Sequence, residues 1–459
     1  RYQREEKRSE ADLKIKLPAS VKMVIDSLQA KGYEAYAVGG CVRDSILGRV
    51  PDDWDITTSA TPYEVKNVFQ RTVDTGLKHG TVTVLAGSHA HEVTTYRIDG
   101  EYEDSRHPKS VEFTRNLEED LKRRDFTINA MAYNDQTGLV DLYGGMRDLQ
   151  SKTIRCVGVA KERFGEDALR ILRAVRFSAQ LGFRIDGETE QAIRELAPTL
   201  EHISAERIAV ELTKLLVSDR PEYLKTAWET GITKVILPEF DRLMETPQNN
   251  PHHCCSVGEH TLMSMRYVPA DKVLRWTMLL HDMGKPECRT TDEHGVDHFK
   301  GHGRASVELA KQILKRLKFD NDTIRKATVL IQWHDCRMNA DAKVIRRIMS
   351  KVTPELFEKL LDVQYADTMA QSEYRREEKL ERIEKVRKTS EKILEEKQCI
   401  SQKDLKLKGQ DLIALGVKPG PLVGEILKAA LYEVLEEPSR NDPEILKKFA
   451  KGYLKNREE

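Results

Sequence analysis

The feature that most constrains the fold of this chain is a change in the spacing of its apolar residues near residue 148. Before that point, Val and Thr alternate in short runs at residues 81–86 and 92–97. After it, apolar residues recur at helical spacing, as at Leu172 and Val175. A period of two predicts strands, and a period near 3.6 predicts helices. The sequence therefore predicts an α/β domain followed by a mainly helical region.

The length of the chain predicts several folding units. A chain of 459 residues is too long for one ordinary hydrophobic core and suggests about three domains. Residues 372–397 carry mixed charges and few apolar positions, which is typical of a solvated helix or connector. Apolar periodicity then returns at residues 406–453. We expect an α/β head at 1–147, a helical neck at 148–245, a helical body at 246–372, and a charged connector with a helical tail at 373–459.

Charge and cysteine content narrow the class of protein. Lys and Arg number 75, as do Asp and Glu, so the chain has no overall positive field and any contact with nucleic acid must be local. The seven cysteines include no CxxC pair, which disfavours a disulfide framework and a cysteine zinc site. Residues 1–8 are charged and no apolar run has the length of a membrane span. These features predict a cytoplasmic protein with no membrane partner.

A pair of carboxylates follows a glycine doublet near the start of the chain. Asp53 and Asp55 should lie on the same side of a strand and could hold Mg²⁺ against a triphosphate. The composition produces about twelve such acid-x-acid pairs by chance, so the pair depends on its context. Gly39-Gly40 stands between a predicted strand and helix, where backbone N–H groups can bind a phosphate, and Arg43 lies one turn into that helix. Without the carboxylates, the doublet would be read as a turn.

The order of the motifs resembles that of the class II tRNA nucleotidyltransferase and poly(A) polymerase family. The signature GG-x-VRD followed by D-x-D spans residues 39–55, and the chain lacks the GxxxxGK[ST] pattern of P-loop proteins. Four further segments match the family in order, at residues 75–84, 123–130, 166–173 and 203–208. The resemblance implies a polymerase-β-like nucleotidyltransferase head followed by an all-α neck, body and tail.

The same resemblance implies roles for individual residues and for the partners. Asp53 and Asp55 would bind Mg²⁺, while Gly40, Arg43 and Arg124 would contact the nucleotide. The expected reaction follows the two-metal template, in which an RNA 3′-hydroxyl attacks the α-phosphate and pyrophosphate leaves. The expected substrates are tRNA, CTP and ATP. Glu92 is either a third acidic ligand or an ordinary exposed strand residue.

A carboxylate and three arginines follow at helical spacing and could read the base. Asp167, Arg170, Arg173 and Arg176 are each three residues apart, so all four can face one cleft if they share a helix. Cytosine and adenine both present an amino donor beside a ring-nitrogen acceptor, whereas uracil and guanine present a carbonyl and an N–H. An Asp acceptor beside an Arg donor therefore suits CTP and ATP. The alternative is a solvated arginine-rich helix face.

Two further segments distinguish activities within the family. Residues 99–109 resemble the flexible loop that full CCA-adding and A-adding enzymes have and that CC-only enzymes lack. Residues 409–424 resemble the tRNA-embracing tail of bacterial CCA-adding enzymes. A poly(A) polymerase usually carries a basic tail, which a chain with a pI near 7.3 does not show. Addition of the complete CCA is therefore the favoured activity.

The predicted body contains a second candidate metal site. Residues 279–286 resemble the HD phosphohydrolase superfamily, whose ligand positions are all occupied in order. Histidine and carboxylate ligands suit several divalent metals, whereas an isolated histidine is more often structural. Residues 253–255 fit no site that the sequence defines. The predicted ligands of this second divalent metal are His260, His281, Asp282, His302, His334 and Asp367.

The sequence leaves three alternatives to CCA addition open. The first is an A-adding or poly(A)-adding enzyme that takes ATP without CTP. The second is a phosphohydrolase that acts on RNA 3′ phosphates at the HD site, either as its main activity or in addition to nucleotide transfer. The third is a non-catalytic RNA-binding protein, which Asp53, Asp55 and Arg170 disfavour.

Overall fold

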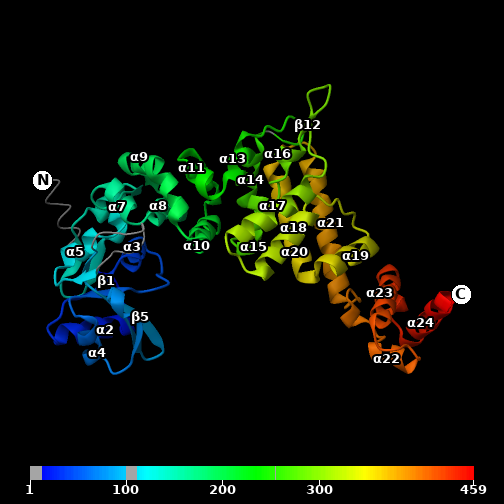
Figure 1. Ribbon diagram of the computed structural model, residues 1–459, viewed down its shortest axis with the longest axis horizontal. Helices are drawn as coiled ribbons and strands as arrows, with labels where there is room; N and C mark the ends of the chain where they lie inside the picture. Colours follow the sequence, from blue (N-terminus) through cyan, green and yellow to red (C-terminus); the bar gives the residue numbers. More distant parts are fainter. Residues whose placement is uncertain (1–12, 100–110, 254, 459) are drawn as a thin grey trace. The chain divides into compact units, whose positions relative to one another are not determined.

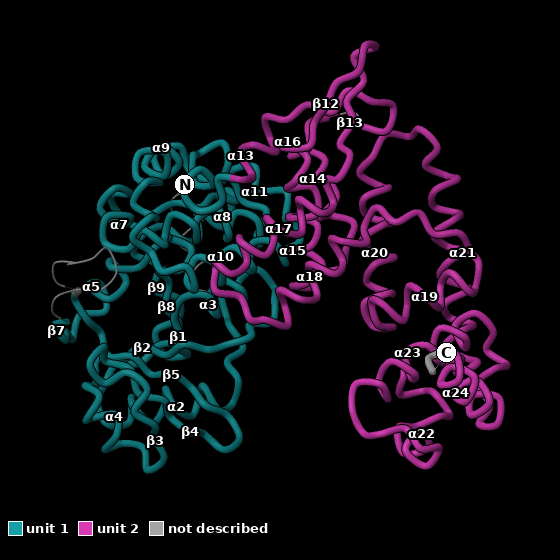
Figure 2. The backbone as a smooth tube through the Cα atoms, turned by 45° about the vertical axis from the view of Figure 1, so that its right-hand side comes forward, with its two compact units in different colours: residues 1–238 teal, residues 239–459 magenta. Residues whose placement is uncertain are grey.

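The computed structural model describes residues 13–99, 111–253 and 255–458, and Figure 1 shows the order of its helices and strands. The chain divides into two compact units, residues 1–238 and 239–459 (Figure 2). The division falls inside the predicted neck, and the predicted loop at residues 99–109 lies almost wholly outside the described residues. An N-terminal mixed sheet followed by a largely helical chain confirms the predicted fold class.

The sheet of unit 1 positions the predicted transferase residues. Its seven strands lie in the order β3-β4-β5-β2-β1-β8-β9. Within it, β2 and β5 are parallel, and the other neighbours are antiparallel. The strand bounds are β1 (Ala35–Val38), β2 (Ile56–Thr58), β3 (Thr72–Gly76), β4 (Thr81–Ala86), β5 (His89–Thr95), β8 (Met131–Asn134) and β9 (Gly138–Asp141). A separate pair, β6 (Arg97–Asp99) and β7 (Val111–Phe113), lies outside this sheet.

The helices of the head form where sequence signals predict them. The helix α2 (Ala19–Ala30) buries Val24 and Leu28 on its apolar face, and it contacts β1 and β4. The helix α4 (Pro62–Val68) begins at Thr61, whose side chain forms a capping box with Glu64. The other helices are α3 (Gly40–Ile46), α5 (Leu117–Lys122) and α6 (Gly145–Gln150).

The remainder of unit 1 is mostly helical, as the periodicity predicts. Its main elements are α7 (Ala160–Glu166), α8 (Leu169–Leu181), α9 (Gly187–Leu196), α10 (Ala205–Leu216), α11 (Leu224–Glu229) and α12 (Ile232–Ile236). The helix α8 packs against α10 and buries Leu172 and Val175. The only strands in this part of the described chain are β10 (Thr153–Ile154) and β11 (Arg184–Ile185), which pair in parallel.

Unit 2 is built from helices with one short hairpin. The hairpin joins β12 (Thr290–Thr291) to β13 (Asp297–His298). In the part of the chain that the structure describes, no helix is long and apolar enough to cross a membrane. The helices are α13 (Pro238–Glu245), α14 (Val257–Met265), α15 (Lys272–Leu280), α16 (Lys285–Cys288), α17 (His302–Arg316), α18 (Asn321–Trp333), α19 (Ala342–Val352), α20 (Pro354–Ala370), α21 (Arg376–Glu395), α22 (Gly409–Ala414), α23 (Pro421–Glu436) and α24 (Pro443–Glu458).

The helix α21 occupies most of residues 372–397, for which the sequence predicts a solvated helix or connector, and one of its faces is buried. It packs against α20 and α19 and buries Ile383, Val386 and Ile393. These residues are spaced three and seven apart, which puts them on one helix face. The abundance of charged residues conceals this narrow apolar stripe in the sequence.

Candidate functional site

The junction of β1 and α3 brings Arg124 beside the glycine doublet. Gly39 has a φ of +81°, a conformation that residues with a Cβ rarely adopt. A Cβ on Gly39 would also lie 3.2 Å from Nη1 of Arg124. The amide N–H of Gly39 donates to the Met131 carbonyl at 3.1 Å, which ties the junction to β8. Glycine at this position therefore lets the Arg124 guanidinium approach the backbone where α3 begins.

The predicted metal-binding carboxylates lie at the start of β2, the strand between β1 and β5. Asp53 and Asp55 stand directly before β2 rather than within it, which corrects their predicted place on a strand. The Asp55 carbonyl still accepts from the Val38 N–H at 3.0 Å, so sheet-like pairing reaches Asp55. On the other side, Ile56 pairs in parallel with Val93, so Glu92 occupies the register position beside Asp55.

These carboxylates form an acidic site that is open to solvent. The side chains of Asp53, Asp55 and Glu92 are exposed. Desolvation by the surrounding protein and the charge of Asp53 nevertheless raise the pKa of Asp55, and the Arg124 charge only partly offsets them. A bound divalent cation would relieve this repulsion, and oxygen ligands are those that Mg²⁺ prefers. The donors present therefore fit Mg²⁺.

Three of the predicted nucleotide-binding arginines surround one aromatic ring. The guanidinium carbons of Arg43, Arg173 and Arg176 lie 5.0, 5.3 and 4.0 Å from the ring centre of Phe177. The Arg43 guanidinium also donates to the Asn129 side-chain oxygen at 2.6 Å. The structure thus brings an arginine of α3 together with two arginines of α8.

Acidic partners hold the two α8 arginines in place. Nε of Arg173 donates to Asp125 at 2.8 Å, and Nε of Arg176 lies 2.7 Å from a Glu211 oxygen. Burial alone would raise the pKa of Asp125, but the charges of Arg173 and Arg170 outweigh it and lower the pKa to about 2. Burial lowers the pKa of Arg176 to about 10 despite the Glu211 charge. Asp125 and Arg176 therefore stay charged at neutral pH.

The predicted helix face shared by Asp167 and the three arginines is wrong in one respect. Asp167 ends α7 in an extended conformation, so it is not on α8 with Arg170. One Asp167 oxygen accepts from Arg207 at 2.8 Å, and the other accepts from the Leu169 N–H at 3.0 Å. The Arg170 guanidinium instead donates to Glu166 and to the Arg123 carbonyl. Asp167 and Arg170 therefore have separate partners.

Sequence reasoning named no role for several of these partners. Asp125 and Asn129 lie inside the matched segment 123–130, and Arg207 lies inside 203–208. Glu211 follows one helical turn after Arg207 on α10, and its carboxylate is buried against Arg173 and Arg176. A buried charge needs a partner, so the three arginines imply acidic residues near them. Nothing in the sequence identifies which acidic residues these are.

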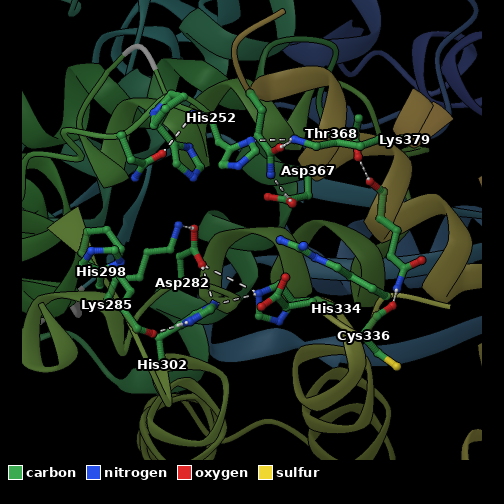
Figure 3. A pocket seen from close by; sticks show the side chains of 18 of the residues that line it. His252, Asp282, Lys285, His298, His302, His334, Cys336, Asp367, Thr368 and Lys379 are labelled. Atoms are coloured by element: carbon green, nitrogen blue, oxygen red, sulfur yellow. Dashed lines mark hydrogen bonds and ion pairs between the residues drawn. The ribbon is translucent and has the colours of Figure 1, made fainter. Parts of the chain in front are cut away.

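The six predicted HD residues meet in unit 2. His260 lies on α14, Asp367 on α20, and His302 begins α17. His281 and Asp282 follow α15, and His334 follows α18. Their ligand atoms form two groups that share Asp282: one with His260, His281 and Asp367, the other with His302 and His334. Figure 3 shows Asp282, His302, His334 and Asp367 around the same space.

Backbone carbonyls orient three of these histidines. In each, Nδ1 contacts a carbonyl oxygen three residues earlier, and a carbonyl can only accept a hydrogen bond, so Nδ1 carries the hydrogen. This arrangement directs Nε2 toward the other ligand atoms, as is usual for metal-binding histidines. The contacts are His281 to Met278 at 2.7 Å, His302 to Phe299 at 2.9 Å and His334 to Ile331 at 2.6 Å.

The Nε2 atoms of the cluster fit a divalent metal. Those of His302 and His334 lie 3.2 Å apart, although neither needs to carry a hydrogen, and Nε2 of His281 is buried without a hydrogen bond among the described residues. Burial, together with the charge of His281, lowers the pKa of His334 to about 4, so His334 is in the neutral form that binds metals. A metal beside Asp282 would contact the Nε2 atoms of His302 and His334, which otherwise face one another.

The carboxylates give the cluster a negative field. Burial alone would lower the pKa of His281, but Asp282 and Asp367 outweigh it and raise the pKa to about 10. Nζ of Lys285 lies 2.8 Å from an Asp282 oxygen and also donates to Gln248. These two contacts hold the positive charge of Lys285 beside Asp282, where a metal ion would also bring positive charge. Lys285 lies within the segment at residues 279–286 that resembles the HD superfamily, and the sequence alone assigns it no role.

Comparisons with known proteins match three separate parts of the chain. Family models match at residues 35–155 (Poly A polymerase head domain), 182–244 (RNA and SrmB- binding site of polymerase A) and 304–450 (tRNA nucleotidyltransferase domain 2). The HD assignment stays a prediction.

Full-length relatives extend the match to almost the whole chain. The CCA-adding enzyme of Streptococcus suis (strain 05ZYH33) is 33% identical over 433 residues, which cover 94% of this chain and 96% of the relative. That of Lactiplantibacillus plantarum is 36% identical, covering 95% and 97%. The crystal structure of Bacillus stearothermophilus CCA-adding enzyme in complex with CTP is 30% identical, with a TM-score of 0.75 and coverage of 96% and 99%. This chain therefore belongs to the CCA-adding enzymes, a family of tRNA nucleotidyltransferases.

Proposed function

We propose that this chain adds CCA to the 3′ end of tRNA from CTP and ATP and releases pyrophosphate. The observation that carries the proposal is the position of Asp53 and Asp55 beside the Gly39 junction and Arg124, within the unit that holds the arginine cluster. The relative from Bacillus stearothermophilus, whose structure was solved with CTP, supports a cytidine nucleotide as one substrate. Division of the chain into head, neck, body and tail, and a place in the cytoplasm, are part of the proposal.

The side chains in unit 1 divide the task between metal and phosphate binding. Asp53 and Asp55, with Glu92 beside them, would hold Mg²⁺, which supplies positive charge for the transition state. Arg124 and Arg43 supply positive charge to the triphosphate near Gly40. The bond from the RNA 3′ oxygen to the α-phosphorus forms as the bond to pyrophosphate breaks. Metal ions and arginines together would carry the charge of the leaving group.

Selection of the base is assigned to Asp167 and Arg170, with Arg173 and Arg176 behind them. In the structure, Asp167 contacts Arg207 and the Leu169 N–H, which hold its carboxylate beside α8. A carboxylate has about four acceptor positions, so Asp167 can accept a further hydrogen bond from the amino group of cytosine or adenine. A carbonyl in the same place would be repelled.

A tRNA that ends at its discriminator base tests this proposal. With CTP alone the product should be two nucleotides longer, and with CTP and ATP it should be three nucleotides longer. Extension with ATP alone would instead favour an A-adding or poly(A)-adding enzyme. No extension under any of these conditions would favour a non-catalytic RNA-binding protein.

A second candidate function concerns the carboxylate and histidine cluster in unit 2. The observation that favours it is the convergence of six predicted ligands with oriented Nε2 atoms. A divalent ion bound there supplies a Lewis acid that activates water at neutral pH and stabilises phosphoryl oxygens. We propose that unit 2 hydrolyses 2′,3′-cyclic or terminal phosphates at RNA 3′ ends, because these groups block the hydroxyl that unit 1 requires.

The chemistry of this second activity is a hydrolysis without any oxidant or reductant. To open a 2′,3′-cyclic phosphate, a water oxygen bonds to phosphorus, the bond from phosphorus to the 3′ oxygen breaks, and that oxygen takes up a proton, which leaves a 2′-phosphate. A second water breaks the remaining bond from phosphorus to ribose in the same way and releases inorganic phosphate. The test is tRNA with a 2′,3′-cyclic phosphate, incubated with wild type and Asp282→Ala in Mg²⁺, Mn²⁺, Ni²⁺ or Zn²⁺. No hydrolysis by wild type in any of these metals would refute the hydrolase role.

A further inference from the structure

A pocket joins the carboxylate and histidine cluster to the helix that leads to the tail. Its volume is about 590 Å³, and its lining includes Asp282 and Asp367 of the cluster as well as Lys379 and Arg382 of α21. Pockets of this size hold ligands as large as a nucleotide. In Figure 3, Lys379 lies on the side of Asp367 and Thr368, whereas Asp282 and Lys285 lie on the opposite side. The cluster ligands and Lys379 therefore border the same space.

A chain of hydrogen bonds connects the cluster to Lys379. Nε2 of Gln371 donates to Oδ2 of Asp367 at 2.7 Å. Oε1 of Gln371 accepts from Nζ of Lys379 at 2.6 Å. The other Asp367 oxygen lies 2.9 Å from Nε2 of His260. If the Gln371 amide were flipped, its oxygen would face the Asp367 carboxylate and its NH₂ group would face the Lys379 ammonium. Neither pair could form a hydrogen bond, so the orientation of the Gln371 amide is fixed. Asp367 therefore positions Lys379 through Gln371.

The ammonium of Lys379 retains donor capacity toward the pocket. Besides Gln371, Lys379 donates to Nδ1 of His252 at 3.2 Å. An ammonium has three N–H groups, so these two contacts leave one for an acceptor inside the pocket. The side chain is partly buried, which excludes some of the water that would otherwise serve as that acceptor.

Positive charge accumulates around Lys379 in the lining of the pocket. Arg337 and Arg382 line the pocket together with Lys379. Burial and the charges of Arg337, Arg382 and Arg375 lower the pKa of Lys379, and the Asp367 carboxylate offsets them only in part. The positive charges of these neighbouring side chains repel one another, and an anion bound between them would relieve that repulsion.

We infer that Lys379 binds a phosphate oxygen, so that a phosphate ester is held between the cluster and α21. The inference rests on the proposed hydrolase function and names the residue that would anchor its substrate. The phosphorus would face Asp282 and the histidines, while Lys379 contacts an oxygen on the α21 side. Arg382 and Arg337 line the same pocket. The ligand class is a phosphate ester of nucleotide size.

Phosphate binding to the full-length protein tests this role without relying on turnover. Inorganic phosphate is titrated calorimetrically into wild type, Lys379→Met and Lys379→Arg, each loaded with Mn²⁺. Lys379→Met should weaken phosphate binding about tenfold or more, because a charge-assisted hydrogen bond is lost. Lys379→Arg should stay within about threefold of wild type. Lys388→Met is the matched control, since Lys388 is exposed on the same helix, and it should bind as wild type does.

Binding of Mn²⁺ alone separates an anion contact from a structural role. Lys379→Met should bind Mn²⁺ as tightly as wild type or more tightly, because a nearby positive charge has been removed. Equal losses of Mn²⁺ and phosphate binding would overturn the inference, as would unchanged phosphate binding in Lys379→Met. Absence of hydrolysis in wild type would overturn the hydrolase proposal, yet weaker Mn²⁺-dependent phosphate binding in Lys379→Met would still support this anion site.

Discussion

The two candidate metal sites of this chain differ in how much of each site the protein builds. Asp53 and Asp55 are exposed and have only Glu92 as an acidic neighbour in the sheet register. In unit 2, His302 and Asp367 are half-buried, the other four predicted ligands are buried, and Asp282 belongs to both groups. Mg²⁺ commonly binds through one or two carboxylates together with substrate phosphates and water. We therefore expect substrate to complete the first site, whereas the protein itself supplies the ligands of the second.

The arginines predicted to bind the nucleotide are held by protein partners, whereas the predicted metal-binding carboxylates are exposed. Asp125 and Glu211 hold Arg173 and Arg176 near Phe177, and Asn129 holds Arg43. Fixed charges that await a substrate reduce the ordering required when it binds. Unit 1 therefore combines predicted nucleotide contacts that protein partners already hold with an open candidate metal site.

Removal of the open carboxylates should have the largest effect. Asp53→Ala or Asp55→Ala should lower nucleotide addition by about 1000-fold or more, because metal-held charge acts in the transition state. Binding of tRNA should change only a few-fold, since neither residue is needed for docking. The measurement is single-turnover addition beside a tRNA binding assay. Addition within about tenfold of wild type in both variants would contradict the two-metal assignment.

Metal binding without nucleotide sharpens the comparison between the two sites. Asp282→Ala should weaken Mn²⁺ binding by about 100-fold, because Asp282 belongs to both ligand groups. Asp53→Ala should leave the same affinity nearly unchanged. Titration of Mn²⁺ into the nucleotide-free proteins measures both. If Asp53→Ala reduced the affinity as strongly as Asp282→Ala, the distinction between open and prebuilt sites would fail.

The ion pair of Asp125 and Arg173 should contribute to the stability of unit 1. Asp125→Asn should lower the free energy of unfolding by about 2 kcal/mol at pH 7, because Arg173 loses its partner. The pKa of Asp125 is lowered to about 2, so its contribution is complete above about pH 4 and is lost as pH falls toward 2. Urea unfolding of both proteins at several pH values measures this difference.

Exposed Asp52 offers a control for that measurement, since Asp52→Asn should change stability little. A difference between wild type and Asp125→Asn that grew as the pH fell would have the wrong sign. Such a result would show that Asp125 is not held as a carboxylate by Arg173.

Base selection should respond less strongly than catalysis. Asp167→Ala should relax the rejection of UTP about tenfold, because the acceptor that disfavours a carbonyl is gone. Incorporation of UTP and CTP is compared in competition. Arg207→Leu should shift the same ratio in the same direction and by less, since Arg207 only holds Asp167. Intact selectivity with a slower rate in Asp167→Ala would mean that Asp167 does not read the base.

Local sequence patterns predict which residues are ligands better than they predict which distant residues those ligands contact. The alternation at residues 81–86 predicts β4 correctly, and the ordered HD motif predicts six residues that the fold brings together. The break between α7 and α8 is different, because it depends on Arg207, which lies 40 residues from Asp167. Helical spacing alone continues through that break. Tertiary contacts override local periodicity there.

The helix α21 shows the same limit of local patterns from the opposite direction. Its many charges predict exposure, yet Ile383 and Val386 pack inward. That packing turns Lys379 toward Gln371, which lies on the segment that follows α20. A contact between residues brought together by helix packing cannot be deduced from the charge pattern of either segment.

The independence of the two sites is tested most directly with one tRNA prepared in two forms. One form lacks CCA and ends in a free 3′-hydroxyl, and the other lacks CCA and ends in a 2′,3′-cyclic phosphate. Both are incubated with CTP, ATP, Mg²⁺ and Mn²⁺ in the presence of wild type, Asp53→Ala or Asp282→Ala. Wild type should add CCA to both forms, Asp282→Ala only to the hydroxyl form, and Asp53→Ala to neither while still removing the cyclic phosphate. Equal extension of both forms by Asp282→Ala, or its failure on the hydroxyl form, would contradict two separate sites.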